Sequence, residues 1–204
     1  MKKAFSLLAT LALSATFTFA ADEAGFVPLF NGKDTTGWHL RRKDGHNSWT
    51  IDGGVLKNTV KAGEHGTDLV TDKKFWNFTV RYEFQVPDNS NSGFYLRGRH
   101  EIQILGDFKN GKAAKGGNGA IYNHTAPSEF ASKPGGEWQT AEATIIGNKI
   151  TVTLNGKKIH DNVECNKATG SEIDNKVNEP GPIFLQGDHG TVSFRNMRIK
   201  ELPQ

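Results

Sequence analysis

Cysteine is nearly absent from this chain, which has a single one, Cys165, in 204 residues. One thiol cannot form an internal disulfide, so packing must stabilise the fold, and zinc sites built on two or more cysteines are excluded. Cys165 stands in a polar stretch, with His160 as its only notable neighbour in the sequence. We interpret it as a structural thiol rather than a nucleophile.

Long hydrophobic runs are missing after the first twenty residues. Those twenty begin with Met and two lysines, continue with an apolar run over Ala4–Leu13, and end in Thr18-Phe19-Ala20. This order predicts a signal peptide over residues 1–20, because the run is too short and too often interrupted by serine and threonine for a membrane span. We therefore expect an exported protein, periplasmic or extracellular, with a single domain over residues 21–204.

The chain also lacks a large excess of positive or negative residues. The chain has 25 Lys and Arg against 22 Asp and Glu, and two of the lysines lie in the predicted signal peptide. The mature net charge is therefore about +1, without the basic stripe that nucleic acids bind. No glycine-rich dinucleotide-binding loop is present either. We expect a small, neutral or weakly charged partner, with no nucleic acid and no membrane span.

Helical periodicity is scarce, and short alternating runs separated by 23 glycines and 7 prolines take its place. The cleanest run is Phe78–Val86, in which apolar and polar residues alternate. Turn signals at Gly53-Gly54, Gly147-Asn148 and Asn155-Gly156 join neighbouring runs. Many short strands without intervening helices predict an all-β fold, an antiparallel sandwich of two sheets. The expected strands are Trp49–Ile51, Val55–Lys57, Asp68–Thr71, Asn77–Val86, Gly93–Arg97, Glu101–Leu105, Ala120–Tyr122, Thr140–Ile146, Lys149–Leu154, Ile183–Gln186 and Val192–Ile199.

Two stretches lack this alternation. Residues 108–136 are rich in lysine, glycine, asparagine, serine and proline, with one short apolar segment at residues 120–122. Residues 162–182 form the second stretch. Long irregular segments in compact domains are often binding loops, so both stretches are candidates for that role, although Lys109–Lys115 is interpreted as a solvated loop.

One strand pair carries an unusual number of polar groups on one side. In residues 94–104, apolar side chains alternate with a polar set that includes Arg97, Glu101 and Gln103. If the apolar set faces the core between two sheets, the polar set faces outward, where a curved sheet forms a concave groove. Gly98 would supply a turn between Arg97 and Glu101, which brings the guanidinium and the carboxylate close enough to pair. The alternative is an ordinary solvent-exposed ion pair.

A second polar cluster follows an apolar strand near the C-terminus. Gln186, Asp188 and His189 stand there, between glycines that allow sharp turns. His189 is the strongest functional candidate among the 7 histidines. The alternative is a structural histidine that is hydrogen-bonded beneath a loop. We expect this cluster to meet Arg97, Glu101 and Gln103 in a single groove.

A series of short motifs runs from Leu29 to Ile199. They are Leu29–Asp34 with Gly37-Trp38, Trp49–Leu56, Leu69–Thr71, Phe75–Phe78, Asn91–Arg97, Glu101–Leu105, Gly119–Tyr122, Lys133–Trp138, Leu154–Gly156, Leu185-Gln186 with His189-Gly190, and Phe194–Ile199. Each motif is weak alone, but their order is specific. It resembles the 3-keto-disaccharide hydrolase domain family, exported bacterial proteins long known only as a domain of unknown function.

The resemblance implies a concanavalin/laminarinase-like jelly roll, in agreement with the alternating strands. It also implies lyase or hydrolase activity on glycosides whose sugar is oxidised at carbon 3. The matching site positions are Arg97, Glu101, Gln103, Tyr122, Trp138, Gln186 and His189. We add Asp188 and Lys133, which stand within or beside these motifs, as candidates for sugar binding.

The implied chemistry is an elimination. A carbonyl at carbon 3 acidifies the hydrogen on carbon 2, so a side-chain base can remove it and the glycosidic oxygen on carbon 1 can leave, with water adding later. The hypothesis makes His189 or Glu101 the base, Arg97 the stabiliser of the enolate and Tyr122 the acid that protonates the leaving oxygen. Trp138 would stack on the sugar.

Partners and cofactors follow from the same hypothesis. A separate oxidoreductase would supply the 3-keto substrate. A divalent cation held by Glu101 and His189 would polarise the ketone, although no ligand spacing in the sequence establishes a metal site.

Two other functions stay open from the sequence. An ordinary jelly-roll glycoside hydrolase needs two carboxylates flanking the bond, but Glu101 is followed at the strand spacing by Gln103, an amide. Glu137 across the groove would have to serve instead. A non-catalytic carbohydrate-binding, lectin-like module would use the same groove with Trp138 and Tyr122 as stacking platforms, and would need no base.

Overall fold

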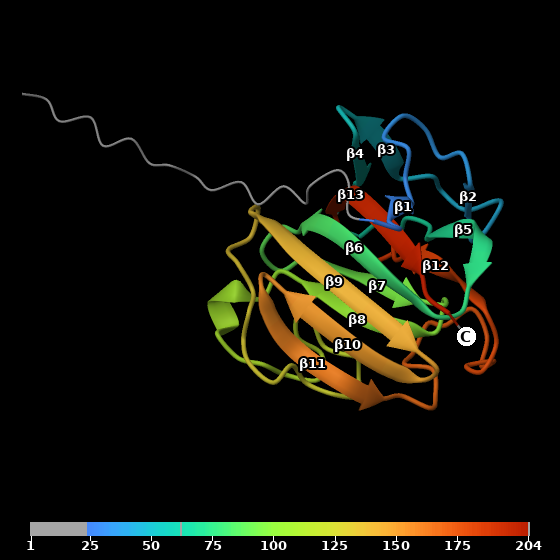
Figure 1. The fold of residues 1–204 in the computed structure, drawn as a ribbon. Coiled ribbons are helices and arrows are strands. Elements are labelled where there is room, and N and C mark those ends of the chain that lie inside the picture. Colours follow the sequence, from blue (N-terminus) through green and yellow to red (C-terminus); the bar gives the residue numbers. More distant parts are fainter. Residues whose placement is uncertain (1–23, 62, 204) are drawn as a thin grey trace, which may run out of the picture.

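The computed structural model describes residues 24–61 and 63–203. Two antiparallel sheets pack against each other, which confirms the predicted all-β sandwich (Figure 1). The predicted signal peptide over residues 1–20 lies outside the described residues. No helix in the described part of the chain is long and apolar enough to cross a bilayer.

The described residues form strands β1 to β13 and one 3-10 helix, η1. The larger sheet has eight strands in the order β11-β10-β9-β6-β13-β4-β3, with β1 paired to β13, and the smaller has five in the order β2-β5-β12-β7-β8. The bounds are β1 Val27–Pro28, β2 Trp38–Leu40, β3 Trp49–Asp52, β4 Val55–Asn58, β5 Leu69–Phe75, β6 Phe78–Gln85, β7 Asn91–Leu96, β8 His100–Leu105, η1 Phe108–Asn110, β9 Trp138–Ile146, β10 Lys149–Leu154, β11 Lys157–Glu164, β12 Gly181–Leu185 and β13 Val192–Glu201.

The core lies between the two sheets. On β6 the apolar positions of the alternating run, from Phe78 to Phe84, are buried against it. The ring of Tyr82 on β6 stacks on that of Phe94 on β7, with centroids 4.0 Å apart and planes inclined by 5°. This contact joins the larger sheet to the smaller one, so the face of β7 that carries Phe94 is fixed toward the core.

The predicted hairpin turns are present. Asn155 and Gly156 both have positive φ, 51° and 82°, between β10 and β11, and Gly53 and Gly54 have φ of 54° and 81° between β3 and β4. Two consecutive residues with positive φ match the right-handed twist of the flanking strands. The turn chemistry of the sequence therefore sets these strand boundaries.

Some predicted elements differ from the structure. Ala120–Tyr122 is not a strand, because Ile121 makes only isolated bridges to Ile102 and Thr125. Strand β11 was not expected, and its pairing with β10 contains register shifts that break the period-2 pattern. The second irregular stretch therefore begins after Glu164 rather than at residue 162. Strands β1 and β2, of two and three residues, are too short to leave a pattern.

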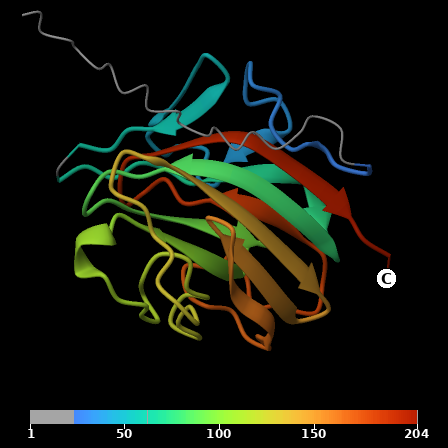
Figure 2. The ribbon, with the colours of Figure 1, turned by 60° about the vertical axis from the view of Figure 1, so that its left-hand side comes forward.

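The segment between β8 and β9 is irregular, as predicted for residues 108–136, apart from η1, which projects from one end of the molecule in Figure 2. Buried Asp107 anchors it, because its carboxylate accepts the backbone N–H of Asn118 at 2.9 Å and the hydroxyl of Ser132 at 2.9 Å. The segment is thus held against the outer edge of β8, and it borders the face described next.

Candidate functional site

The outer face of the five-stranded sheet brings several predicted site residues together. In the β7–β8 register Tyr95 lies opposite Glu101 and Gly93 opposite Gln103. The backbone N–H of Gln186, just beyond β12, bonds to the carbonyl of Gly93 at 2.9 Å. Glu101, Gln103 and Gln186 therefore surround Gly93, on the side of the sheet away from the core.

Glu101 lies at the centre of this arrangement. The residue is 3% exposed, and its Oε2 accepts a 2.8 Å hydrogen bond from the hydroxyl of Tyr95. A methyl group at Gly93 would overlap Oε1 of Glu101, so the carboxylate lies directly over a bare stretch of backbone. Burial raises the pKa of Glu101 to about 7, and the hydrogen bond from Tyr95 partly opposes that rise. A carboxylate with this pKa can accept a proton near neutral pH.

Tyr95 is itself held from the neighbouring strand. Its ring stacks on Phe184 of β12, with centroids 3.9 Å apart and planes inclined by 8°. The guanidinium of Arg41 covers Phe184 at 5.2 Å and donates to Asp68 and to the carbonyls of Ser171 and Glu172. Burial and the Glu101 charge raise the pKa of Tyr95, so its hydroxyl remains a proton donor in the hydrogen bond to Glu101. Sequence reasoning assigned no role to Tyr95, although it shares the alternating set that contains Glu101.

Two amide side chains beside Glu101 have unused acceptors. Gln103 and Gln186 are 4% and 5% exposed, and the Oε1 atom of each is buried without a hydrogen-bond partner. The amide nitrogen of Gln103 donates to the carbonyl of Gly116 at 3.3 Å, which turns its Oε1 away from that carbonyl. Buried acceptors without partners are costly, so they mark positions where a ligand with hydroxyl groups gains hydrogen bonds.

His189 and Asp188 lie in the loop after β12, close enough to Glu101 to act on its charge. His189 acts to lower the pKa of Glu101, and Asp188 and Asp68 act to raise it. The Nδ1 of His189 hydrogen-bonds to the carboxylate of Asp188, which leaves Nε2 free of that contact. The histidine is about half exposed. Of the C-terminal polar cluster, Gln186 is the residue that backbone pairing places beside Glu101.

Tyr122 is placed along β8 by its backbone, whose N–H donates to the carbonyl of Glu101 at 3.0 Å. Its ring lies within 4.0 Å of the positions that methyl groups at Gly116 and Gly170 would occupy. Gly116 accepts the Gln103 amide, and Thr169, next to Gly170, accepts the backbone N–H of Glu101. The half-buried phenol thus stands at the edge of the face that carries Glu101.

Arg97 does not join this face, which corrects the expectation that it pairs with Glu101 or stabilises an enolate there. Its φ of 55° breaks the strand alternation and turns the side chain elsewhere. The buried guanidinium donates to the carbonyls of Trp76, Val177 and Gly147 and covers the Trp76 ring at 3.7 Å. Burial lowers the pKa of Arg97 to about 10, and nearby Arg99 contributes to this decrease. Arg97 is therefore a structural residue that ties three loops together.

Trp138 and Lys133 are also separated from Glu101. Strand β9 belongs to the eight-stranded sheet, and Trp138 lies on its outer face beneath the guanidinium of Arg195 at 4.0 Å. The two outer faces point in opposite directions, so the expected stacking of Trp138 on a sugar beside Glu101 is wrong. The Lys133 ammonium donates to the carbonyl of Trp138 at 3.1 Å, which holds it at the start of β9.

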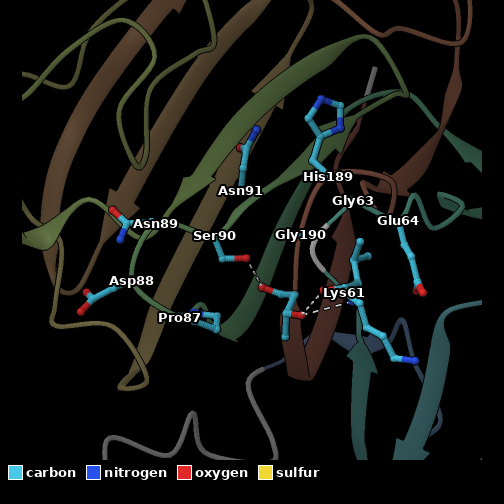
Figure 3. Close-up of a pocket in the computed structure, with 12 residues that line it drawn as sticks. Lys61, Gly63, Glu64, Pro87, Asp88, Asn89, Ser90, Asn91, His189 and Gly190 are labelled. Carbon is cyan, nitrogen blue, oxygen red and sulfur yellow. Dashed lines mark hydrogen bonds between the residues drawn. The ribbon is translucent and has the colours of Figure 1, made fainter.

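Two open hollows lie near this sheet, one at the start of β7 and the other at the end of β8. One of about 340 Å³ has Asn91 and His189 in its lining (Figure 3). The other, of about 420 Å³, is lined by Leu105, Asn110 and residues of the β8–β9 segment. Within the described residues, no three His, Cys, Asp or Glu side chains gather as a metal site would require.

Comparison with known families gives a match over most of the chain. Residues 25–200 match the family described as a 3-keto-alpha-glucoside-1,2-lyase-like domain. A 3-keto-disaccharide hydrolase of Bacteroides thetaiotaomicron is 28% identical over an alignment 232 residues long, gaps included, which takes in 89% of this chain and 80% of that protein.

Solved structures share the architecture. A candidate glycosyl hydrolase from Parabacteroides distasonis aligns with a TM-score of 0.71 and 28% identity over 88% of this chain and 84% of its own. The β-glucanase of Bacillus licheniformis aligns with a TM-score of 0.53 and 12% identity over 87% of this chain and 97% of its own. The second likeness concerns the fold alone, and it confirms the predicted concanavalin/laminarinase-like jelly roll.

Proposed function

We propose that this chain, which belongs to the family of 3-keto-alpha-glucoside-1,2-lyase-like domains, is a carbohydrate-active enzyme that cleaves 3-keto-glycosides. The proposed reaction is a base-assisted elimination, and water then adds to the product. One observation carries the proposal. The buried Glu101 carboxylate, with its pKa raised to about 7, lies between two buried amide oxygens that lack partners. Such a base, flanked by acceptors for hydroxyl groups, suits proton abstraction from a sugar.

Glu101 is the proposed base. Its carboxylate takes the proton from carbon 2, and the electrons of that C–H bond move toward the carbonyl at carbon 3 to give an enolate. The enolate then re-forms the carbonyl, a double bond forms between carbons 1 and 2, and the bond from carbon 1 to the glycosidic oxygen breaks. Addition of water across the new double bond gives the free 3-keto sugar, so the net result is hydrolysis.

The other residues of the face have supporting roles in this proposal. Gln103 and Gln186 accept hydrogen bonds from sugar hydroxyls through the oxygens that are otherwise unpaired. Tyr122, at the edge of β8, donates its phenol proton in a hydrogen bond to the developing enolate oxygen. His189, oriented by Asp188, protonates the leaving oxygen.

The cellular setting is part of the same proposal. The predicted signal peptide makes the protein exported, to the periplasm or the medium. The carbonyl at carbon 3 arises by oxidation of a secondary alcohol, and the sequence contains no glycine-rich dinucleotide-binding loop. A separate oxidoreductase would therefore supply the substrate.

The test compares a 3-keto-glucoside with the matching unoxidised glucoside. Released leaving group and absorbance of the conjugated enone are followed for the wild type, Glu101→Gln and, as a matched control, Glu137→Gln on an exposed loop. We expect turnover of the oxidised substrate only, a loss of about 100-fold or more in Glu101→Gln, and wild-type rates in Glu137→Gln.

Other outcomes point to the rival functions. Turnover of the unoxidised glucoside that is lost in Glu137→Gln would indicate an ordinary glycoside hydrolase. Saturable binding of either sugar without turnover would indicate a carbohydrate-binding module, and the elimination proposal would be abandoned.

A further inference from the structure

The outer face of the five-stranded sheet carries a small apolar cluster of its own. Val70, Phe184 and Tyr95 pair across β5, β12 and β7, and they form a buried cluster separate from the core between the sheets. Phe184 and Tyr95 are fully buried, although they alternate along their strands with residues that face that core. The outer face of a sandwich sheet is normally open to solvent, so another part of the chain must cover these two rings. The covered cluster adjoins the proposed base, because the hydroxyl of Tyr95 bonds to Glu101.

A segment of the second irregular stretch is attached beside this cluster. It consists of residues 169–173, here called the strap, and lies between β11 and β12. Its first backbone N–H donates to the carbonyl of Arg99 at 3.0 Å, and its last donates to the carbonyl of Gly98 at 2.9 Å. The hydroxyl of Thr169 accepts the backbone N–H of Glu101 at 2.9 Å. The ends of the strap are therefore fixed to the turn between β7 and β8 and to the strand that carries the proposed base.

The middle of the strap is held by a side chain, that of Arg41, just after β2. Its guanidinium donates to the carbonyl of Ser171 at 2.8 Å and to that of Glu172 at 2.7 Å. The same group donates to the carboxylate of Asp68 at 3.2 Å and lies over the ring of Phe184 at 5.2 Å. A guanidinium can donate to several acceptors in its plane while it contacts an aromatic ring. Arg41 therefore joins the strap to the aromatic stack, and both lie over the apolar cluster.

We propose that Arg41 is a positioning residue for the proposed base, and that it acts through the strap and the aromatic stack; this inference rests on the proposed elimination. One route runs from Arg41 through Phe184 and Tyr95 to the carboxylate of Glu101. The other runs along the strap to Thr169, whose hydroxyl holds the backbone N–H of the same residue. Both ends of the glutamate are thus held by groups that Arg41 packs in place, and its loss lets the carboxylate move away from the hydrogen that it removes.

The experiment uses two substitutions of Arg41 and one control. Arg41→Met keeps an unbranched side chain against Phe184 and removes every donor. Arg41→Lys keeps the charge and an ammonium donor but not the planar fork. The matched control is Arg42→Met at the next position, where the exposed guanidinium has one 3.4 Å bond to the carbonyl of Gly66.

The first measurement is the steady-state kinetics of the folded variants on a 3-keto-glucoside. We expect kcat to fall about 10-fold or more in Arg41→Met with KM within about twofold of wild type, because the base is displaced while the two glutamines proposed to bind the sugar stay in place. Arg41→Lys should have an intermediate kcat, and Arg42→Met should match wild type. An unchanged kcat in Arg41→Met, an equal fall in the control, or a rise in KM alone overturns the proposal.

The second measurement needs no substrate. Hydrogen exchange of the Glu101 amide, which bonds to the strap, is compared by NMR with that of Val80, a buried amide on β6 in the other sheet. We expect exchange at Glu101 to be about 10-fold faster in Arg41→Met than in wild type, with Val80 unchanged, because only the strap opens. Unchanged exchange at Glu101, or an equal rise at Val80, overturns the proposal. If the wild type converts no 3-keto-glucoside, the proposed function falls, and the exchange rates alone decide whether Arg41 holds Glu101.

Discussion

The Tyr95 hydroxyl and the Glu101 carboxylate, which face each other across the β7–β8 pair, are joined by a 2.8 Å hydrogen bond. Phe184 fixes the Tyr95 ring from the other side. The orientation and charge of the carboxylate therefore depend on a residue from each of two neighbouring strands. Four predictions test this arrangement and the residues around it.

Tyr95→Phe should move the pH profile of kcat/KM. The hydrogen bond from Tyr95 lowers the pKa of Glu101 against the effect of burial, so its removal raises that pKa further. The proposed base then ionises at higher pH, so the rising limb of the pH profile moves to higher pH. The phenylalanine ring keeps the stack with Phe184. A loss of rate that is equal at every pH would instead indicate a purely structural role for Tyr95.

Glu101→Gln should change the pH dependence of stability. The pKa of Glu101 is about 7 in the folded protein against 4.5 for an unperturbed glutamate, so between these values the folded state binds more protons than the unfolded state. Wild-type stability therefore falls as pH rises through this window, and the glutamine variant avoids that loss. The free energy of unfolding in urea should favour Glu101→Gln over wild type by up to about 3 kcal/mol more at pH 8 than at pH 5. A difference that does not change with pH would contradict the raised pKa.

Gly93→Ala should strongly lower activity while the sandwich still folds. The new methyl would overlap Oε1 of Glu101 and come within 2.9 Å of Cε2 of Tyr95. Gly93 has no positive φ, so the backbone accepts alanine, and we expect a stability loss of about 1–3 kcal/mol together with a drop in kcat of about 100-fold. Gly181→Ala is the matched control in the same sheet, because its methyl would meet Arg97 and Arg99 instead. If kcat of the folded protein fell equally in both variants, the loss in Gly93→Ala would not be due to displacement of the Glu101 carboxylate.

Arg97→Lys should lower stability rather than catalysis. Lysine keeps the charge but cannot donate to the carbonyls of Trp76, Val177 and Gly147 together. We expect a loss of about 2–4 kcal/mol in the free energy of unfolding, measured in urea, with kcat of the folded protein retained. Arg42→Lys, whose exposed guanidinium has one 3.4 Å bond to Gly66, should change stability by less than about 0.5 kcal/mol. A fall in kcat without a loss of stability would indicate that Arg97 takes part in the reaction.

The residues beside Glu101 show how far local reasoning reaches. The alternation in residues 94–104 placed Glu101 and Gln103 on the outward side, where the structure has them. The same alternation also contained Tyr95, but nothing local indicated that its hydroxyl would reach Glu101. That contact depends on strand register, which is settled when the two strands pair.

The sequence by itself determined the alternating strands, the glycine and asparagine turns between them and the two-sheet sandwich, because side-chain alternation and backbone dihedral preferences are properties of a few adjacent residues. Only the tertiary structure decided that the Arg97 side chain binds three backbone carbonyls instead, that Trp138 belongs to the opposite sheet, and that Gln186 lies beside Gly93. These positions depend on the order of strands within each sheet and on which loops pack at the ends of the sandwich. Both are fixed by contacts between residues far apart in the chain.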